Sequence, residues 1–311
     1  MFGFRKFKNP NTKHQTLKTV KKMANLKEIR GRISSISSTM QITRAMKMVS
    51  AAKLKKAQDA IVMLRPYSEK LQEIIQNVNS SSDPDQVSIY AQKREVKRVL
   101  FITVTSNRGL AGAFNSNVVK ELNIQFQNNA QYEVEVLSIG KKAYDAVRKT
   151  RTVYSNESAV FDNLNFDTVA NVTEAVMSSF KEGKFDEVYV IYNKFVNAAT
   201  QEVTTEKLLP ITMAEVDPTQ PQVETDYIFE PNRAEILDNL IPKSIKTQVF
   251  KAVLDSVASE HGARMTAMHK ATDNAQELKN DLVIFYNKAR QAAITNEILE
   301  IVSGAEALKN S

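Results

Sequence analysis

Cysteine is absent from this chain of 311 residues, which excludes disulfide bonds, a thiolate nucleophile and a cysteine-ligated metal site. The three histidines, His14, His261 and His269, are too few and too scattered for a histidine metal site. No run of about 18 apolar residues occurs, so we expect no segment to span a membrane. No pair of carboxylates stands out for acid/base catalysis, and no serine has a nearby histidine to activate it. We therefore expect no catalytic residue, no cofactor and no metal.

Glycine is missing from a long stretch near the N-terminus, between Gly31 and Gly109, where apolar residues recur every three or four positions. This spacing predicts a helix over residues 24–80, which would be roughly 80 Å long at the rise of an α-helix. Pro66 lies inside it and is expected to kink it or to start a new segment. The predicted apolar stripe comprises Leu26, Ile29, Ile33, Ile36, Met40, Ile42, Met46, Val49, Leu54, Ile61, Leu64, Leu71, Ile74, Ile75 and Val78.

Proline and glycine are also scarce at the other end, where residues 233–308 contain only Pro242, Gly262 and Gly304. The same spacing predicts a second helix there, roughly 110 Å long and therefore too long for one small domain. Because the two helices lie at opposite ends of the sequence, we expect them to pair as an antiparallel coiled coil. The predicted contact positions of the second helix are Met268, Ala271, Ala275, Leu278, Leu282, Phe285, Ala289 and Ala292.

The middle of the chain, residues 96–218, has the pattern of an α/β domain. Apolar and β-branched runs predict strands at 99–104, 133–139, 188–192 and 202–208. Helical stretches at 113–127, 141–148 and 167–182 separate them, which indicates a mostly parallel, Rossmann-like sheet. The fold class is therefore α/β: a long antiparallel two-helix coiled coil, formed by the N- and C-terminal helices, with a Rossmann-like domain inserted between them.

The formal net charge is +7, and residues 1–27 carry eight lysines and arginines without an aspartate or glutamate. Residues 1–23 form a basic extension, interpreted as a disordered tail, as residues upstream of the usual start, or as a mitochondrial transit peptide. The first helix has a basic face with Asp59 as its single acid between residues 44 and 65. We favour an acidic protein partner for this face over nucleic acid, because no aromatic residue is interleaved. Its basic residues are Arg44, Lys47, Lys53, Lys55, Lys56 and Arg65.

The turn at residues 106–112, which lies between a strand and a helix, is the sharpest enzyme-like signal. A glycine turn of this kind can hold phosphate through backbone N–H groups, but its G-x-x-G spacing matches neither nucleotide-binding fingerprint. A tight strand-to-helix turn is the simpler interpretation. The residues leave two alternatives open. One is a nucleotide-binding enzyme. The other is a basic coiled-coil interaction or nucleic-acid-binding protein with a nucleotide-binding α/β domain.

Five segments carry a specific resemblance to a known family. They are ANLKEIRGRI at 24–33, TMQITRAMKMV at 39–49, ARM at 263–265 with ATDNA at 271–275, YNKARQAAITNE at 286–297 and IVSGA at 301–305. The chain resembles the gamma subunit of F-type ATP synthases, in its bacterial rather than its mitochondrial form. The turn at 105–112 also agrees, and the resemblance covers residues 24–308.

The resemblance implies a rotor shaft and not an enzyme in its own right. In that family the coiled coil lies inside a hexamer of three alpha and three beta subunits. The α/β domain is a foot that binds the epsilon subunit and the membrane ring of c subunits, so membrane association is through this ring only. Proton flow turns the shaft, which drives ATP synthesis in the beta subunits. The implied location is the cytoplasmic side of the plasma membrane, with the matrix side of the mitochondrial inner membrane as the alternative, and no nucleic acid is involved.

The resemblance also assigns roles to individual positions. Contacts with the hexamer are implied for Arg44, Met46, Arg264, Arg290, Gln291, Thr295, Glu297 and Glu300. Phe229 and Glu230 match foot positions near the c ring. The last turns of the second helix are largely apolar and suit an apolar bearing, in which the helix end turns inside an apolar collar. The bearing residues are Ile298, Ile301, Val302 and Leu308.

Overall fold

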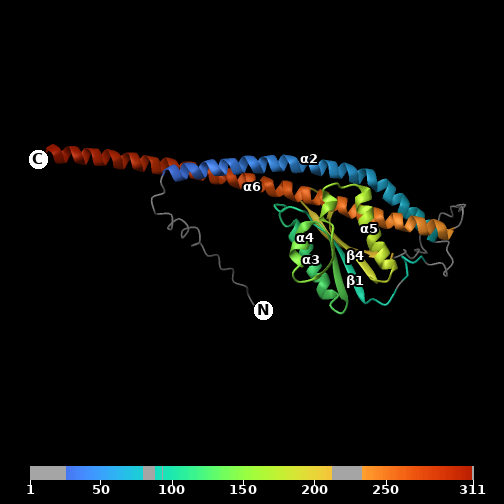
Figure 1. Cartoon of the computed structure of the whole chain (residues 1–311). Coiled ribbons are helices and arrows are strands. Elements are labelled where there is room, and N and C mark those ends of the chain that lie inside the picture. Colours follow the sequence, from blue (N-terminus) through green and yellow to red (C-terminus); the bar gives the residue numbers. More distant parts are fainter. Residues whose placement is uncertain (1–25, 80–87, 93, 212–232, 310–311) are drawn as a thin grey trace, which may run out of the picture. The chain divides into compact units, whose positions relative to one another are not determined.

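The computed structural model describes residues 26–79, 88–92, 94–211 and 233–309. The chain divides into two units, residues 1–45 with 269–311 and residues 46–268. Two long helices contribute to both units, α2 (Leu26–Asn79) and α6 (Arg233–Lys309) (Figure 1).

In the first unit, α2 and α6 contact each other through polar pairs as well as apolar side chains. The hydroxyls of Thr43 and Thr272 lie 2.8 Å apart, and Lys279 Nζ donates to Ser37 Oγ at 3.4 Å. Arg30 donates to the Tyr286 hydroxyl at 3.3 Å, and its guanidinium lies over the tyrosine ring. Residue numbers rise along α2 as they fall along α6, so the helices are antiparallel, as predicted.

Part of the predicted stripe packs as expected, since Ile29 and Met40 are buried, but several of its positions are exposed. Leu278 and Phe285, predicted to pack, are 50% and 43% exposed, and Ile42 is 60% exposed. On α6 the inward positions include Thr272, Lys279 and Tyr286, whose polar atoms bond to α2. An apolar pattern cannot find such positions, because long or amphipathic side chains bury their carbon atoms while their polar ends find partners.

Prolines do not interrupt either helix. The helical assignment of α2 continues through Pro66, and that of α6 through Pro242. Of the two outcomes predicted at Pro66, a new segment is therefore wrong, and a kink stays a prediction. Helix interiors accept a proline where surrounding packing outweighs the lost hydrogen bond.

The second unit contains a five-stranded sheet in the order β3-β2-β1-β4-β5. The first four strands are parallel, and β5 pairs with β4 in the antiparallel sense. Their bounds are β1 Arg98–Val104, β2 Glu133–Ile139, β3 Thr152–Asn156, β4 Glu187–Phe195 and β5 Gln201–Leu209. The mostly parallel sheet confirms the predicted Rossmann-like class.

Helices cover both faces of this sheet (Figure 1). Apolar residues of α3 (Phe114–Asn128) and α4 (Lys141–Val147) pack on one face, against Val99 and Phe101. Those of α5 (Phe166–Lys181) and the N-terminal part of α6 pack on the other, against Leu100 and Ile102. Because alternate residues of β1 face opposite sides and both faces are covered, its buried positions are apolar except Thr103, which donates to the Leu137 carbonyl. A short 3-10 helix, η1, spans Ser158–Phe161.

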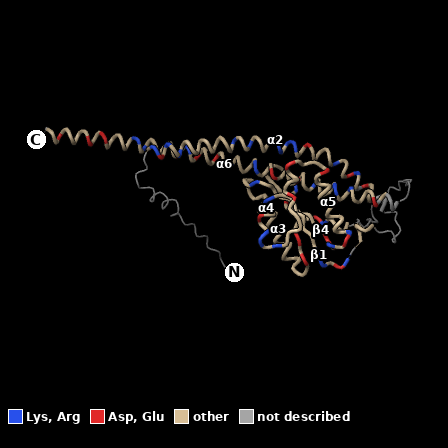
Figure 2. The backbone as a smooth tube through the Cα atoms, viewed as in Figure 1, with Lys and Arg blue, Asp and Glu red and all other residues tan. Residues whose placement is uncertain are grey.

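α2 and α6 also pack together in the second unit. Leu54 and Ala57 of α2 and Ala258 of α6 form a buried cluster, with Ile61 and Met265 at its margin. The outward side of α2 is basic, and lysines and arginines recur along this helix in Figure 2. Val49, predicted in the apolar stripe, is 57% exposed, and the small Ser50 is buried in its place.

Candidate functional site

The carboxyl ends of β1 and β4 are where an open parallel sheet of this topology binds ligands. β1 lies between β2 and β4 in the sheet. The chain passes from β1 to β2 on one side and later adds β4 on the other side, so the direction of strand order reverses between β1 and β4. The turn after β1 (residues 105–113) and the loop after β4 (196–200) border this point. A ligand pocket at this point would be built from these two segments.

The turn after β1 is held by its own polar side chains. Ser106 Oγ donates to the Arg108 carbonyl at 2.5 Å, and Asn115 Nδ2 donates to Ser106 Oγ at 2.9 Å. Asn107 donates to the Ser158 carbonyl at 3.0 Å and accepts from the Lys141 backbone N–H at 3.0 Å. The turn is therefore fixed from both sides, as a tight strand-to-helix connection requires.

Leu110, near the tip of this turn, is in an uncommon conformation. Its φ is +64°, in the left-handed region that few residues other than glycine adopt, and its side chain is 66% exposed. Such strain persists only where the surrounding structure holds it.

Helix α6 provides much of that support, because Arg264 bonds to the turn. Its Nη2 atom donates to the carbonyls of Gly109 at 3.2 Å and Arg108 at 3.4 Å. Nη1 forms a salt bridge with Glu260 at 2.5 Å, and Arg264 is only 8% exposed. Burial raises the pKa of Glu260, and the neighbouring Arg264 acts in the opposite direction. The turn thus presents carbonyl oxygens to a buried cation, the reverse of a phosphate site.

The end of β4 and the loop after it are also bonded to α6. Ser259 donates to the Asn193 carbonyl at 3.0 Å, and Thr266 donates to the Ala198 carbonyl at 3.2 Å. A Cβ atom on Gly262 would lie 3.1 Å from the Ala198 carbonyl oxygen, so helix and loop are in close contact. Helix α6 therefore fills the crevice at the end of β1 and β4, and the phosphate-binding interpretation of residues 106–112 is not supported.

His261 lies in the same buried segment of α6. Burial lowers its pKa to about 4, and the positive charges of Arg264 and Lys53 act in the same direction. The imidazole is therefore neutral at neutral pH. With Glu260 and Arg264, it makes this stretch of α6 polar but internally compensated.

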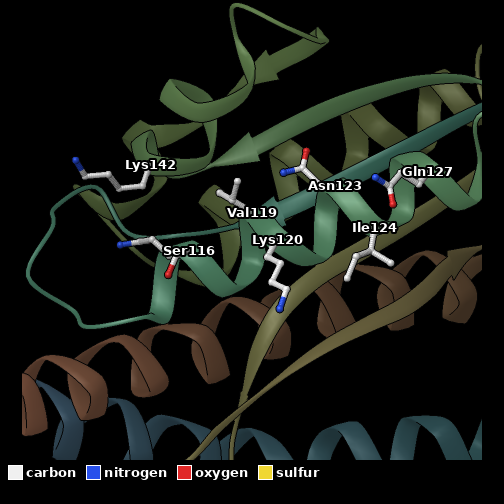
Figure 3. A pocket seen from close by; sticks show the side chains of 8 residues that line it. Ser116, Val119, Lys120, Asn123, Ile124, Gln127 and Lys142 are labelled. Atoms are coloured by element: carbon white, nitrogen blue, oxygen red, sulfur yellow. The ribbon is translucent and has the colours of Figure 1, made fainter. Parts of the chain in front are cut away.

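A groove of about 610 Å³ runs along α3 on the surface of the second unit. Figure 3 shows Ser116, Lys120, Asn123 and Gln127 of α3 along it, with Lys142 at one end. No carboxylate lines it. This groove was not predicted, since its residues belong to an ordinary exposed helix face.

The predicted hexamer contacts differ in exposure. Arg44 is exposed and Met46 is half-buried on α2. Arg264 is buried and bonded within the chain, which leaves little of it for any partner. The predicted contact residues that follow Arg264 on α6 are all exposed. Among them, Thr295 donates to the Gln291 carbonyl at 2.9 Å. The exposed group comprises Arg290, Gln291, Thr295, Glu297 and Glu300.

The predicted bearing residues are exposed apolar side chains. Ile298, Ile301, Val302 and Leu308 are 55%, 67%, 54% and 79% exposed. Phe229 and Glu230 lie outside the described residues. The prediction missed the role of Glu260, although its spacing of four residues from Arg264 on a helix is typical of an ion pair.

Comparison with known proteins identifies the family. The sequence matches the ATP synthase family over residues 25–308. It is 59% identical to the ATP synthase gamma chain of Flavobacterium psychrophilum, over 92% of this chain and 100% of the relative.

Two solved structures have a similar fold. One is a chain of the central stalk and c ring of Tetrahymena thermophila mitochondrial ATP synthase, with a TM-score of 0.54 and 25% identity over 74% of this chain and 99% of that one. The other is a chain of the rotor of Euglena gracilis mitochondrial ATP synthase, with a TM-score of 0.62 and 23% identity over 86% and 98%. The chain therefore belongs to the ATP synthase gamma chain family, in its bacterial form.

Proposed function

We propose that this chain is the central rotor shaft of a proton-translocating F-type ATP synthase. It transmits rotation of a membrane ring of c subunits to the catalytic sites of a hexamer of three alpha and three beta subunits, and it regulates ATPase activity and proton flow. The observation that carries the proposal is the 59% identity to a gamma chain over that chain's whole length. The chain is a non-catalytic subunit, and its ligand crevice is filled by its own helix.

The exposed end of α6 fits a shaft that is enclosed by other subunits. From Arg290 to Leu308 every described side chain is exposed, including those of the apolar residues. An apolar surface of this kind marks a contact with a partner. Because hydrophobic contact is non-directional, an apolar collar can hold the helix end while it turns. The proposed bearing residues are Ile298, Ile301, Val302 and Leu308.

Polar contacts with the hexamer are proposed for positions of α6 beside its apolar end and for positions of α2. Arginine forms charge-assisted bonds with carboxylates, each contributing about 1.5–3 kcal/mol, which can break and reform as a rotor turns. The basic side of α2 suits an acidic loop of a beta subunit. The proposed residues are Arg44, Met46, Arg290, Gln291, Thr295, Glu297 and Glu300, with Arg264 limited to the small part of its side chain that stays exposed.

The foot of the shaft is proposed to bind the epsilon subunit and the c ring, the latter through Phe229 and Glu230. The division into an extension (1–23), two shaft helices (24–80 and 233–308) and an α/β foot (96–218) belongs to this proposal. Membership of the family places the chain in a membrane-associated complex. Among the described helices, none has the length and apolar character needed to cross a membrane. We propose the cytoplasmic side of the plasma membrane as its location.

Native mass spectrometry of the complex purified from its source tests the proposal. We expect one copy of this chain with three alpha and three beta subunits, and its retention with epsilon and the c ring in detergent. A complex that contains the hexamer and ring but lacks this chain would contradict it. Hydrolysis of ATP by the purified chain alone would instead support the nucleotide-binding alternative, which its relatives do not favour.

A further inference from the structure

A second concave surface of the α/β unit lies where α3 and α4 end. Its volume is about 530 Å³, and it is lined mainly by the residues that follow these helices and by the start of β2. Three of the lining residues are cations, Arg148, Lys149 and Arg151, and none is a carboxylate. A hollow with this lining selects for a negatively charged ligand.

The guanidinium of Arg151 is held in place by an aromatic ring. Its carbon Cζ lies 4.2 Å from the centroid of Phe126, which is itself buried. Stacking fixes the plane of the guanidinium and leaves the N–H groups at its edge directed away from the ring. No described side chain accepts a hydrogen bond from Arg151. It is therefore a pre-oriented donor, and an anion in the hollow is the acceptor that it lacks.

The other two cations add charge without being neutralised. Arg148 has one distant ion pair, 3.7 Å from Asp145, and Lys149 forms no ion pair with a described residue. Some surface lysines of this unit do have a close acidic partner, as Lys184 has in Glu182 at 2.8 Å. In the hollow, three cations lie together and share a single long ion pair.

The end of a helix accounts for one of these charges. Cations can offset the negative end of a helix dipole, an effect confined to the end of the helix. Arg148 is the C-cap residue of α4, whereas Lys149 and Arg151 lie beyond both helices. Glu133 and Glu135 alternate with Val134, which lines the hollow, so they leave the strand on the opposite face. The hydroxyls of Tyr132 and Thr152 supply further hydrogen-bond donors at its wall.

We propose that this hollow binds an oligophosphate anion, with the guanidinium of Arg151 and the ammonium of Lys149 as its main ligands. Phosphate oxygens match the planar fork of an arginine, and two linked phosphates can reach both cations. The proposal rests on the charges of the hollow and on the ring contact of Arg151, and not on the rotor function.

Binding of pyrophosphate to the full-length chain, measured by titration calorimetry at low ionic strength, tests the site. We expect saturable binding that weakens as salt is added, because the contacts are charged and exposed. Arg151→Gln with Lys149→Gln should weaken binding about tenfold or more, since two charge-assisted bonds are lost. Arg151→Lys, which keeps the charge but not the stacked fork, should weaken it less.

Lys184→Gln is the matched control, because it removes one exposed cation of the same unit outside the hollow. It should leave pyrophosphate binding unchanged, and circular dichroism should show all variants folded. Equal weakening by the control would mean a general charge effect and would overturn the proposal. No saturable binding by the folded native chain would overturn it as well.

A phosphate group can come from a free anion or from a lipid headgroup, and a second measurement separates these sources. The full-length chain is sedimented with vesicles of phosphatidylglycerol or of phosphatidylcholine. Binding to the anionic vesicles that pyrophosphate displaces, and that Arg151→Gln abolishes, identifies a headgroup. Pyrophosphate binding without vesicle binding identifies a free oligophosphate.

Discussion

Arg264 Nη2 lies 3.2 Å from the carbonyl oxygen of Gly109, so a helix near the end of the chain is bonded to the first turn of the α/β unit. The same guanidinium forms a buried salt bridge with Glu260. These bonds close the crevice in which a sheet of this topology would bind a ligand. They explain how a Rossmann-like sheet can serve as a rigid part of a shaft.

Removing the Arg264 guanidinium should destabilise the second unit. Arg264→Met leaves Glu260 buried without its partner and frees two carbonyls of the turn. Breaking one side of a buried pair costs about 3–5 kcal/mol, and we expect the lower end because a small part of the pair is exposed. Urea unfolding of the full-length chain measures the loss.

The double variant Arg264→Met with Glu260→Gln is the control for this change. It removes the buried negative charge that the single variant leaves, so it should recover part of the lost free energy of unfolding. If the single variant is as stable as the native chain, Arg264 has no bracing role within the unit.

Gly140 should not tolerate a side chain. Its φ is +113°, and a Cβ atom there would lie 2.0 Å from the Thr105 carbonyl oxygen at the end of β1. Gly140→Ala should therefore lower the free energy of unfolding by more than about 2 kcal/mol, from backbone strain and the forced displacement of Thr105. Gly109→Ala is the matched control, since a Cβ atom there meets nothing within 4 Å. Thermal unfolding compares the two variants, and equal unfolding temperatures for both would contradict this account.

Periodicity predicted much of this fold because long regular elements leave a strong signal. Residues 133–139 were predicted as a strand and form β2, and both long helices were predicted within a few residues of α2 and α6. β3 and η1 were missed, since the short stretch around Thr152–Asn156 has no clear alternation. The antiparallel direction of β5 was also not predicted, because it depends on the geometry of the turn after β4 rather than on composition.

The candidate site could be predicted only where its residues belong to a recognised motif. Arg264 was singled out by resemblance, but its bonds to Arg108 and Gly109 join positions more than 150 residues apart. No local pattern encodes such a contact. In the coiled coil, Thr43 and Thr272 occupy the contact positions that an apolar search assigned to neighbours such as Ile42.

Asp255 should make the stability of the second unit depend on pH. Burial raises its pKa to about 6, opposed by Lys251 and reinforced by Glu206, while Lys194 and Arg65 also oppose it. The ordinary value is 3.8, so between pH 4 and 6 the folded chain holds more protons than the unfolded one. Stability contributed by this group is therefore lost as pH rises through that window.

Asp255→Asn should remove this loss. Above pH 7 the free energy of unfolding of this variant should exceed that of the native chain by about 1–2 kcal/mol. Below pH 4 the difference should be small, because the native carboxyl becomes protonated in both states. Chemical unfolding at several pH values measures the difference. Asp281→Asn, at an exposed position of α6, should show no such pH dependence, and a similar profile for both variants would rule out Asp255 as the cause.

The apolar end of α6 should matter to the complex and not to the folding of the chain. Ile301 and Leu308 are 67% and 79% exposed, so replacing both with aspartate should leave the thermal unfolding of the purified chain nearly unchanged. In the reconstituted complex the same charges would enter an apolar collar, where an unpaired carboxylate costs several kcal/mol. We expect less assembled complex, or slower rotation and ATP synthesis.

Ser303→Asp is the control for this change. It adds a charge at the same helix end without removing an apolar side chain, and should impair the complex less. Unimpaired assembly and synthesis by the double variant would show that this end is not a bearing.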